Sequence, residues 1–202
     1  MKEKLMKIYN KLLSHFGEQN WWPTISKNKR LEIIIGAILT QNTSWRQVEK
    51  AIRNLHDRGL LNRKALEEIP TQKLASLIKC TGYYKQKAKK IKEFLKFKGK
   101  ITRENLLKIW GIGRETADSI LLYAYNKPFF VVDAYTKRIF ERLGFGKKNY
   151  DELQKMFHKN LPRDIKVYKE YHALLVELGK NYCRKRNPLC SKCPLNEICK
   201  FK

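Results

Sequence analysis

The chain has 202 residues, of which 43% are apolar, enough to build a hydrophobic core for one or two domains. Its 44 Lys and Arg residues outnumber 19 Asp and Glu residues, so the net charge is +25 and a charge-balanced surface is excluded. An excess of this size predicts a polyanionic partner, and nucleic acid is the first candidate. The alternative is a solvated, lysine-rich surface of the kind found in thermophiles.

The N-terminal segment "MKEKLMKIYNKL" is charged throughout, which is unlike a secretory signal. The longest apolar run, residues 33–39, is too short to cross a bilayer. We therefore expect a cytoplasmic protein without a membrane partner. In a reducing compartment its five cysteines are not expected to form disulfides.

Helical periodicity runs through nearly the whole chain, and strand signals are almost absent, which predicts an all-α fold of about ten helices. The first helical pattern ends at Gly17, and the apolar segment 30–41 is expected to form a buried central helix. Ser44 and Gln47 match a capping box ahead of the next helix, residues 48–55. Further helices are expected over residues 71–80, 85–99, 102–109, 114–125, 134–144, 150–161 and 167–182.

The segment "LLKIWGIGRETADSILLYA" predicts a helix, a tight turn and a second helix. Gly111 and Gly113 permit positive φ angles and expose backbone N–H groups. These donors lie at a helix start, where the helix dipole also favours an anion. A DNA phosphate would fit such a turn, which would position the duplex without reading its sequence. An ordinary tight connection between helices would show the same pattern.

Four of the five cysteines lie close together near the C-terminus. They are Cys183, Cys190, Cys193 and Cys199. Their C-x6-C-x2-C-x5-C pattern predicts a metal site, and four thiolates suit either zinc or a [4Fe–4S] cluster. Arg184, Lys185 and Arg186 lie between the first two and could contact phosphates or offset negative charge at the metal site. Cys80 stands apart and is expected in the core.

A single acid, Asp133, follows the apolar run "FFVV" and precedes the helical pattern "AYTKRIFERLG". Its plainest role is to cap that helix. The functional alternative is a fixed anion beside a sugar C1′, which would stabilise an oxocarbenium-like transition state as a base departs. The four histidines form no convincing catalytic pair, and His172 is expected to be a core residue on an apolar helix.

Together, "WGIGRETA", "VVDAYTKRI" and the cysteine pattern resemble the endonuclease III superfamily of DNA glycosylases over nearly the whole chain. The resemblance implies two helical domains. Residues 22–128 would form a helical barrel that carries the helix–hairpin–helix motif, and residues 1–21 and 129–202 would surround a [4Fe–4S] cluster held by the four cysteines. It also implies an active site in the cleft between the domains, which the target base reaches by flipping out of the duplex.

The resemblance also assigns roles to single residues. Asp133 matches the catalytic aspartate, Gln41 matches a residue that inserts near the space left by the flipped base, and Tyr83 falls at a second wedge position that is usually apolar. The expected DNA-binding residues are Gln41, Tyr83, Gly111, Gly113, Arg114, Arg184, Lys185 and Arg186. Members that also cut the strand carry a nucleophilic lysine 18 residues before the aspartate, where this chain has Glu115. This departure points to glycosylases that use water and leave an abasic site.

Within that subset, Trp21, Trp22 and Pro23 together with "LTQNTSW" and Glu115 resemble the 3-methyladenine DNA glycosylases of the endonuclease III type. In that branch an aromatic at the position of Trp45 lines the base pocket together with the "WWP" stretch, and Glu115 could contact the flipped base there. A 3-alkylated adenine is cationic, and indole faces attract cations. The tryptophans could instead serve only packing. Some members of the branch lack the cysteine quartet that this chain carries.

The sequence therefore predicts a monomeric, monofunctional glycosylase that removes alkylated purines from double-stranded DNA in base excision repair, without lyase activity. A glycosylase for damaged or mismatched pyrimidines is the second reading, and it predicts a polar pocket that reads base edges. A third reading is a non-catalytic iron–sulfur module that binds DNA, in which Asp133 only caps its helix.

Overall fold

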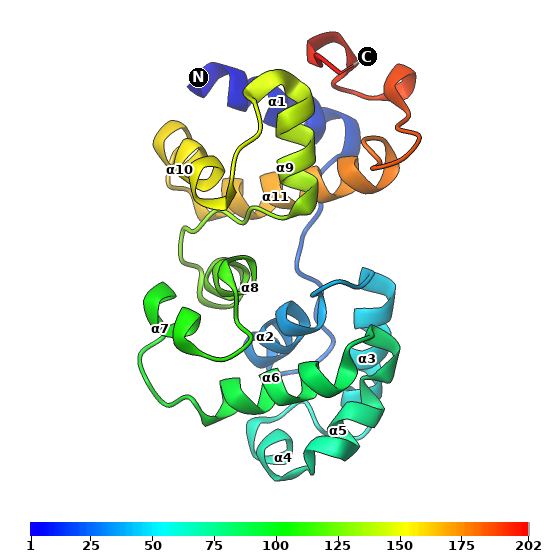
Figure 1. Ribbon diagram of the computed structural model, residues 1–202, viewed down its shortest axis with the longest axis vertical. Coiled ribbons are helices and arrows are strands. Elements are labelled where there is room, and N and C mark those ends of the chain that lie inside the picture. Colours follow the sequence, from blue (N-terminus) through cyan, green and yellow to red (C-terminus); the bar gives the residue numbers. More distant parts are fainter. Residues whose placement is uncertain (202) are drawn as a thin grey trace. The chain divides into compact units, whose positions relative to one another are not determined.

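The computed structural model describes residues 1–201, which fall into two compact units (Figure 1). The middle unit is Trp22–Asn126, and the terminal unit combines Met1–Trp21 with the chain from Lys127 onward. Every regular element in the described residues is helical, so the all-α prediction is confirmed. Among these elements, no helix combines the length and the apolar character needed to span a membrane.

The middle unit is organised around α2 (Lys29–Leu39), in which every residue from Leu31 to Leu39 is buried, as the sequence predicts. Asn28 caps its start by accepting from the N–H of Leu31 at 3.2 Å. Helices α3, α6 and α8 pack against it. The other helices of this unit are α3 (Trp45–His56), α4 (Arg63–Glu68), α5 (Thr71–Leu77), α6 (Tyr84–Lys96), α7 (Arg103–Lys108) and α8 (Arg114–Ser119), which continues as a π-helical stretch to Ala124.

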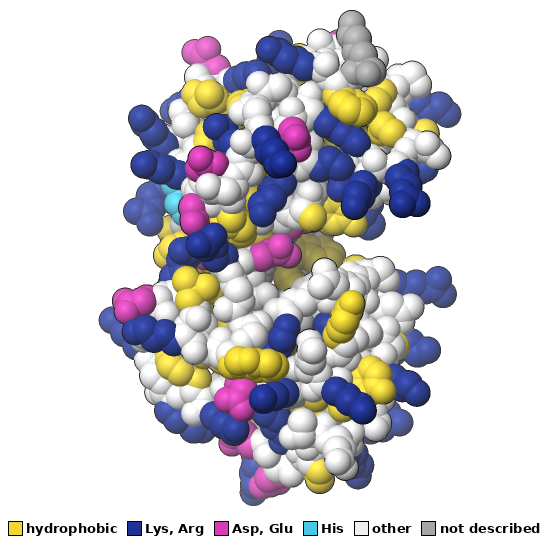
Figure 2. Space-filling model, in the orientation of Figure 1, with side chains coloured by type: hydrophobic (Ala, Val, Ile, Leu, Met, Phe, Trp, Pro, Cys, Tyr) yellow, Lys and Arg dark blue, Asp and Glu magenta, His cyan; other side chains and the backbone are white. Residues whose placement is uncertain are grey.

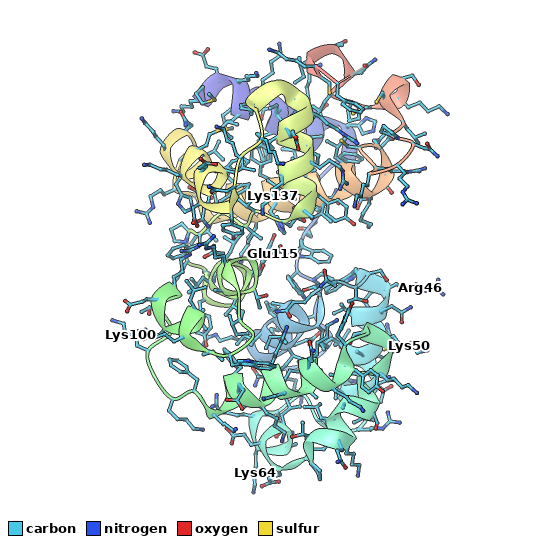
Figure 3. The ribbon with its side chains drawn as sticks, viewed as in Figure 1. Arg46, Lys50, Lys64, Lys100, Glu115 and Lys137 are labelled. Atoms are coloured by element: carbon cyan, nitrogen blue, oxygen red, sulfur yellow. The ribbon has the colours of Figure 1, made fainter. Side chains whose placement is uncertain are left out.

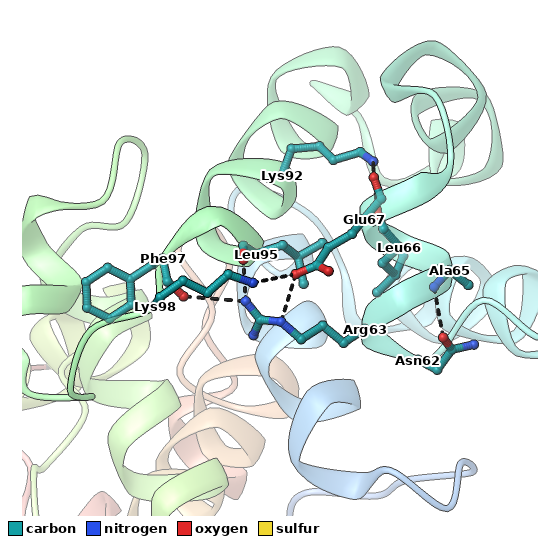
Figure 4. Close-up of polar contacts among 9 residues, drawn as sticks. All are labelled: Asn62, Arg63, Ala65, Leu66, Glu67, Lys92, Leu95, Phe97 and Lys98. Carbon is teal, nitrogen blue, oxygen red and sulfur yellow. Dashed lines mark hydrogen bonds and ion pairs between the residues drawn. The ribbon is translucent and has the colours of Figure 1, made fainter.

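Helix α4 has only six residues, and the sequence analysis did not predict it, because so short an element shows little periodicity. Two cations connect it to α6 (Figure 4). Arg63 of α4 donates to the carbonyl of Leu95 near the end of α6, and Lys92 of α6 donates to the carbonyl of Leu66 in α4 at 2.7 Å. Each helix thus satisfies carbonyl groups of the other that its own backbone leaves open.

The predicted capping box at Ser44 is wrong. Ser44 does precede α3, but its side chain makes no capping bond. The N–H of Gln47 donates to the backbone carbonyl of Ser44 at 3.0 Å instead, so that donor is already satisfied. The expectation that Cys80 lies in the core also fails, since its half-buried thiol lies 3.4 Å from the carbonyl oxygen of Gln47.

The two helices flanking the glycine turn are held by a buried ion pair. Arg103 of α7 donates to both carboxylate oxygens of Asp118 in α8, at 2.7 and 3.1 Å. Asp118 is fully buried, so the two-pronged bond supplies the partner that a desolvated carboxylate requires. The pair therefore fixes the angle at which the chain enters and leaves the turn.

The α-helices of the terminal unit are α1 (Lys2–Phe16), α9 (Ala134–Phe140), α10 (Tyr150–Asn160) and α11 (Ile165–Asn181), and shorter helical turns follow α9 and lie in the cysteine segment. Helix α1 ends at Gly17 with φ 71°, as the sequence predicts. The hydroxyl of Tyr171 in α11 donates to the carbonyl of Leu5 at 2.9 Å, and Lys11 pairs with Glu197 at 2.7 Å. The first helix is thus built into the same unit as the last segments of the chain.

Lys87 of α6 is a buried cation in the middle unit, with 1% of its surface exposed. Its Nζ donates to the carbonyls of Leu39 at 2.9 Å and Thr81 at 2.7 Å. Burial and, to a smaller extent, the nearby charge of Lys90 lower the pKa of Lys87 from 10.5 to about 8, and Cys80 opposes the shift.

This depressed pKa gives a testable pH dependence. Between pH 8 and 10.5 the unfolded chain holds more protons at this group than the folded chain, so the free energy of unfolding should rise with pH. The rise from Lys87 should be on the order of 3 kcal/mol. Urea unfolding of wild type and Lys87→Met at several pH values measures it as a growing difference between the two proteins. Parallel pH profiles would contradict the assignment.

Candidate active site

Asp133 is held at the start of α9 by two hydrogen bonds to one of its oxygens. Its Oδ1 accepts from the backbone N–H of Thr136 at 2.7 Å and from the Thr136 hydroxyl at 2.8 Å, so the predicted N-cap is confirmed. The preceding residues Val131 and Val132 are buried, and Phe130 stacks on Phe157 with ring centroids 3.7 Å apart. The apolar run therefore anchors the backbone, and the cap fixes the direction of the carboxylate.

His172 of α11 lies beside this carboxylate, with its Nε2 3.8 Å from Oδ2 of Asp133. Burial lowers the pKa of His172, although the charge of Asp133 acts in the opposite direction. At neutral pH the ring is therefore mainly a neutral dipole next to the acid. The sequence analysis placed His172 in the core, where it is, but missed its proximity to Asp133. No local pattern could reveal it, because helix packing brings the two together.

The backbone conformation of the glycine turn differs from the prediction at one of its two glycines. Gly111 has a φ of +82°, which suits only glycine at low strain, whereas Gly113 is extended, with φ −88° and ψ 178°. The expectation of positive φ at both glycines is therefore wrong for Gly113. A Cβ atom at Gly113 would meet nothing within 4 Å, so the turn is open on this side. Exposed Arg114 and Glu115 follow it in the first turn of α8, and Glu115 is labelled in Figure 3.

Gln41 lies against this turn although it is 70 residues away in the sequence. Its amide donates to the carbonyl of Gly111 at 3.2 Å and to the hydroxyl of Thr116 at 2.9 Å. Lys90 of α6 donates in turn to Oε1 of Gln41. The middle unit thus brings Gln41 and the glycine turn together, as the assigned roles require.

Tyr83 is 67% exposed and adopts the left-handed conformation, with φ 45°, immediately before α6. This conformation is uncommon for a residue with a bulky side chain. The strained backbone presents the tyrosine ring to solvent rather than packing it into the core.

Trp22 and Trp45 meet edge to face, with ring centroids 5.2 Å apart and an interplanar angle of 87°. Tyr123 completes an aromatic cluster at 5.4 Å from Trp22, and the sequence analysis did not identify it. Gly36 of α2 makes room for the cluster, since a Cβ atom there would lie 2.9 Å from the indole of Trp22. Both tryptophans are half-buried.

Three further residues were predicted to line the base pocket, namely Trp21, Pro23 and Glu115, and Glu115 is exposed in the first turn of α8. Trp21 is half-buried and ends the first segment of the terminal unit, and Pro23 is exposed. Their predicted contribution to a base pocket stays a prediction.

The four predicted cysteine ligands line one small cavity of the terminal unit together with Arg142. Burial raises the pKa of Cys193, and the other three cysteines raise it further, so the four thiols are close enough to interact. Nη1 of Arg142 lies 3.4 Å from the sulfur of Cys183. Across residues 1–201, no set of three His, Cys, Asp or Glu side chains is arranged to hold one metal ion.

The basic residues of the cysteine segment are exposed. Arg184, Lys185 and Arg186 lie on the loop after Cys183, and the carbonyl of Arg184 accepts from Arg142 at 2.7 Å. Lys and Arg side chains are also spread widely over the visible face of the molecule (Figure 2). The positive charge is therefore a property of much of the surface, including that of the candidate site.

Comparison with known proteins agrees with these features. The family model for HhH-GPD superfamily base excision DNA repair proteins matches residues 35–163, which include the aromatic cluster's Trp45, the glycine turn and Asp133. A candidate DNA repair glycosylase of Methanocaldococcus jannaschii is 48% identical over 98% of this chain and 96% of its own length.

Two solved structures have the same architecture. A 3-methyladenine DNA glycosylase of H. pylori (MagIII), bound to 1,N6-ethenoadenine, is 31% identical, with a TM-score of 0.74 over 89% of this chain and 95% of its own. Endonuclease III in a trapped covalent intermediate with DNA is 23% identical, with a TM-score of 0.85 over 99% of this chain and 96% of its own, and shows that the fold is shared. The extent of the family match and the similarity of the relatives lead to one conclusion: the chain belongs to the HhH-GPD superfamily of base excision DNA repair proteins.

Proposed function

We propose that this chain is a monofunctional DNA glycosylase that excises alkylated purines of the 3-methyladenine type from double-stranded DNA. The observation that carries the proposal is the half-buried pair of indoles, Trp22 and Trp45. Indole faces attract cationic rings, and a 3-alkylated adenine in DNA is a cationic ring. Support comes from the 31% identical 3-methyladenine DNA glycosylase of H. pylori, whose structure is bound to 1,N6-ethenoadenine.

Asp133 is suited to the chemical step of such an enzyme. As a base leaves, positive charge develops at C1′ of the sugar, and a fixed carboxylate stabilises it more than mobile water does. The two bonds from Thr136 fix this carboxylate through Oδ1. An alkylated purine leaves readily because its own charge weakens the glycosylic bond, so the site needs no strong general acid.

Docking on DNA would use the glycine turn and the basic surface. Backbone N–H groups at the start of α8 suit a phosphate, and exposed Arg114 adds a cation beside them. Gln41 at the turn and exposed Tyr83 would then enter the duplex as the target base leaves the stack. The exposed Arg184, Lys185 and Arg186 are candidates for further phosphate contacts.

We assign a [4Fe–4S] cluster to the four cysteines, since all four line a single cavity. The donor set consists of sulfur alone, which suits iron–sulfur clusters. Four cysteine thiolates also suit zinc, and metal analysis of the purified protein distinguishes the two. Bound there, the cluster would serve as a structural crosslink that holds the basic loop after Cys183.

The central prediction concerns the released base. Incubated with methylated duplex DNA, the protein should release 3-methyladenine, identified by chromatography. Asp133→Asn should lower the single-turnover rate by at least about a hundredfold, because one electrostatic group is lost. Asparagine keeps an oxygen that can accept from Thr136, so the helix cap and duplex binding should survive. Release of pyrimidines only, or near-normal turnover by the Asn variant, would refute this assignment.

A second prediction follows from Glu115. Strand cutting needs an amine that attacks C1′ and forms a Schiff base, and a carboxylate in the first turn of α8 cannot do so. The product should be intact abasic DNA that breaks only on later treatment with alkali. Borohydride added during turnover should trap no covalent complex between protein and DNA. A trapped complex that disappears when one particular lysine is replaced would show that the mechanism is different.

A third prediction concerns the metal. Protein purified anaerobically should contain about four irons per chain and absorb broadly in the visible range, as iron–sulfur clusters do. Cys193→Ser should lose most of the iron, while Cys80→Ser, which changes the one cysteine outside the cavity, should keep it. Stoichiometric zinc without iron would contradict the assignment.

A further inference from the structure

Two lysines of α6 connect the segments that the proposed function brings to DNA. Lys87 and Lys90 are three positions apart on α6, so they project from the same side of the helix. Lys87 is buried, and Lys90 is half-buried. An ammonium group loses its hydration on burial, which is unfavourable unless protein acceptors replace the water. The identity of those acceptors therefore indicates what each lysine does.

Lys87 reaches two backbone carbonyls that each lie two residues before a residue assigned to DNA opening. One acceptor is Leu39, the last residue of α2, at 2.9 Å, and Gln41 follows it. The other is Thr81, at 2.7 Å, and Tyr83 follows it. A single amine thus fixes the backbone from which both side chains extend.

Lys90 contacts the glycine turn and the side chain of Gln41 directly. Its Nζ donates to Oε1 of Gln41, whose own amide donates to the carbonyl of Gly111 and to the hydroxyl of Thr116. The aliphatic stem of Lys90 also lies directly on Gly111, because a Cβ atom at that glycine would be 2.5 to 2.8 Å from three of the stem carbons. Lys90 therefore contacts both the turn and the side chain bound to it.

We propose that Lys87 and Lys90 are positioning residues that hold Gln41, Tyr83 and the glycine turn as one unit, so that opening of the duplex depends on them more than duplex affinity does. This inference rests on the proposed function, since it assumes that Gln41 and Tyr83 enter DNA. The two amines keep the inserted side chains at a fixed distance and orientation relative to the phosphate held at the turn. Without them, the protein would still bind the duplex, but part of the binding free energy would be offset by the cost of ordering its own loops.

Lys92 provides a matched control on the same helix. Its amine also donates to backbone carbonyls, those of Leu66, Glu67 and Ile69, and its removal changes the net charge by the same amount. These acceptors belong to the end of α4 and carry no residue assigned to DNA. A purely structural role for α6 lysines predicts similar consequences for all three substitutions.

The test compares Lys87→Met, Lys90→Met and Lys92→Met on a duplex with 2-aminopurine beside an uncleavable abasic-site analogue. Its fluorescence reports unstacking without any chemistry, and anisotropy gives the affinity. Lys87→Met and Lys90→Met should bind within about threefold of wild type, because few phosphate contacts change. Their fluorescence increase should fall about tenfold, as expected when inserted groups lose their register. Lys92→Met should retain the wild-type increase, and Lys90→Arg should restore much of it.

The outcomes separate this inference from the function on which it rests. If Lys92→Met loses as much fluorescence as the other two variants, or if the losses follow melting temperature alone, the lysines are only structural and the inference is wrong. If Lys87→Met does not fold, Lys90→Met decides, since this side chain is only half-buried. If wild type opens this duplex but releases no alkylated base from methylated DNA, the proposed function fails while the positioning role stands.

Discussion

The carbonyl groups at the end of α2 have no partner within their own helix, and the buried amine of Lys87 supplies one. The same problem recurs at other helix ends, and charged side chains solve it at several of them. Arg63 and Lys92 satisfy carbonyls where α6 and α4 end, and Asp133 satisfies donors where α9 begins. A protein made of short helices has many helix ends. The hydrogen bonds that the backbone groups at these ends make therefore determine much of the architecture.

This requirement also links the fold to the chemistry. A carboxylate that caps a helix is necessarily well ordered, and a transition state gains most from a charge that does not have to reorganise. Asp133 can therefore serve both purposes with the same geometry, one oxygen holding the helix while the group as a whole provides the charge. The structure shows the cap, and the proposed catalytic role would use the same geometry.

Local features were the ones that the sequence could predict. The buried helix α2, the stop at Gly17 and the cap at Asp133 each depend on residues within a few positions of one another. The family assignment followed from motifs of the same local kind. For this reason the all-helical architecture and the principal candidate residues were accessible before any coordinates.

Features that arise from packing were not accessible. His172 meets Asp133 only because α9 and α11 pack together, and Tyr123 joins the tryptophans through the position of its helix. The prediction of a capping box at Ser44 was wrong because the N–H of Gln47 donates to the backbone carbonyl of Ser44 and not to its side chain. Lys87 illustrates the same limit, since a lysine in a basic helix gives no sign in the sequence that it is buried.

The burial of lysines such as Lys87 changes how the net charge should be interpreted. A surplus of +25 suggests that every lysine is available to phosphates, but several lysines of α6 are engaged with protein carbonyls. Such lysines contribute to the long-range field and not to direct contacts. The salt dependence of binding should thus reflect fewer ions than the composition suggests.

The small size of Gly36 has a different kind of consequence. The indole of Trp22 rests where a side chain of α2 would otherwise be, so the width of the aromatic cluster is set from inside the hydrophobic core. If the cluster forms the base pocket as proposed, substrate range would shift through a core substitution that never touches a ligand. A lineage could therefore change the base it accepts while every residue facing DNA stays the same, and a comparison limited to pocket-lining positions would overlook the cause.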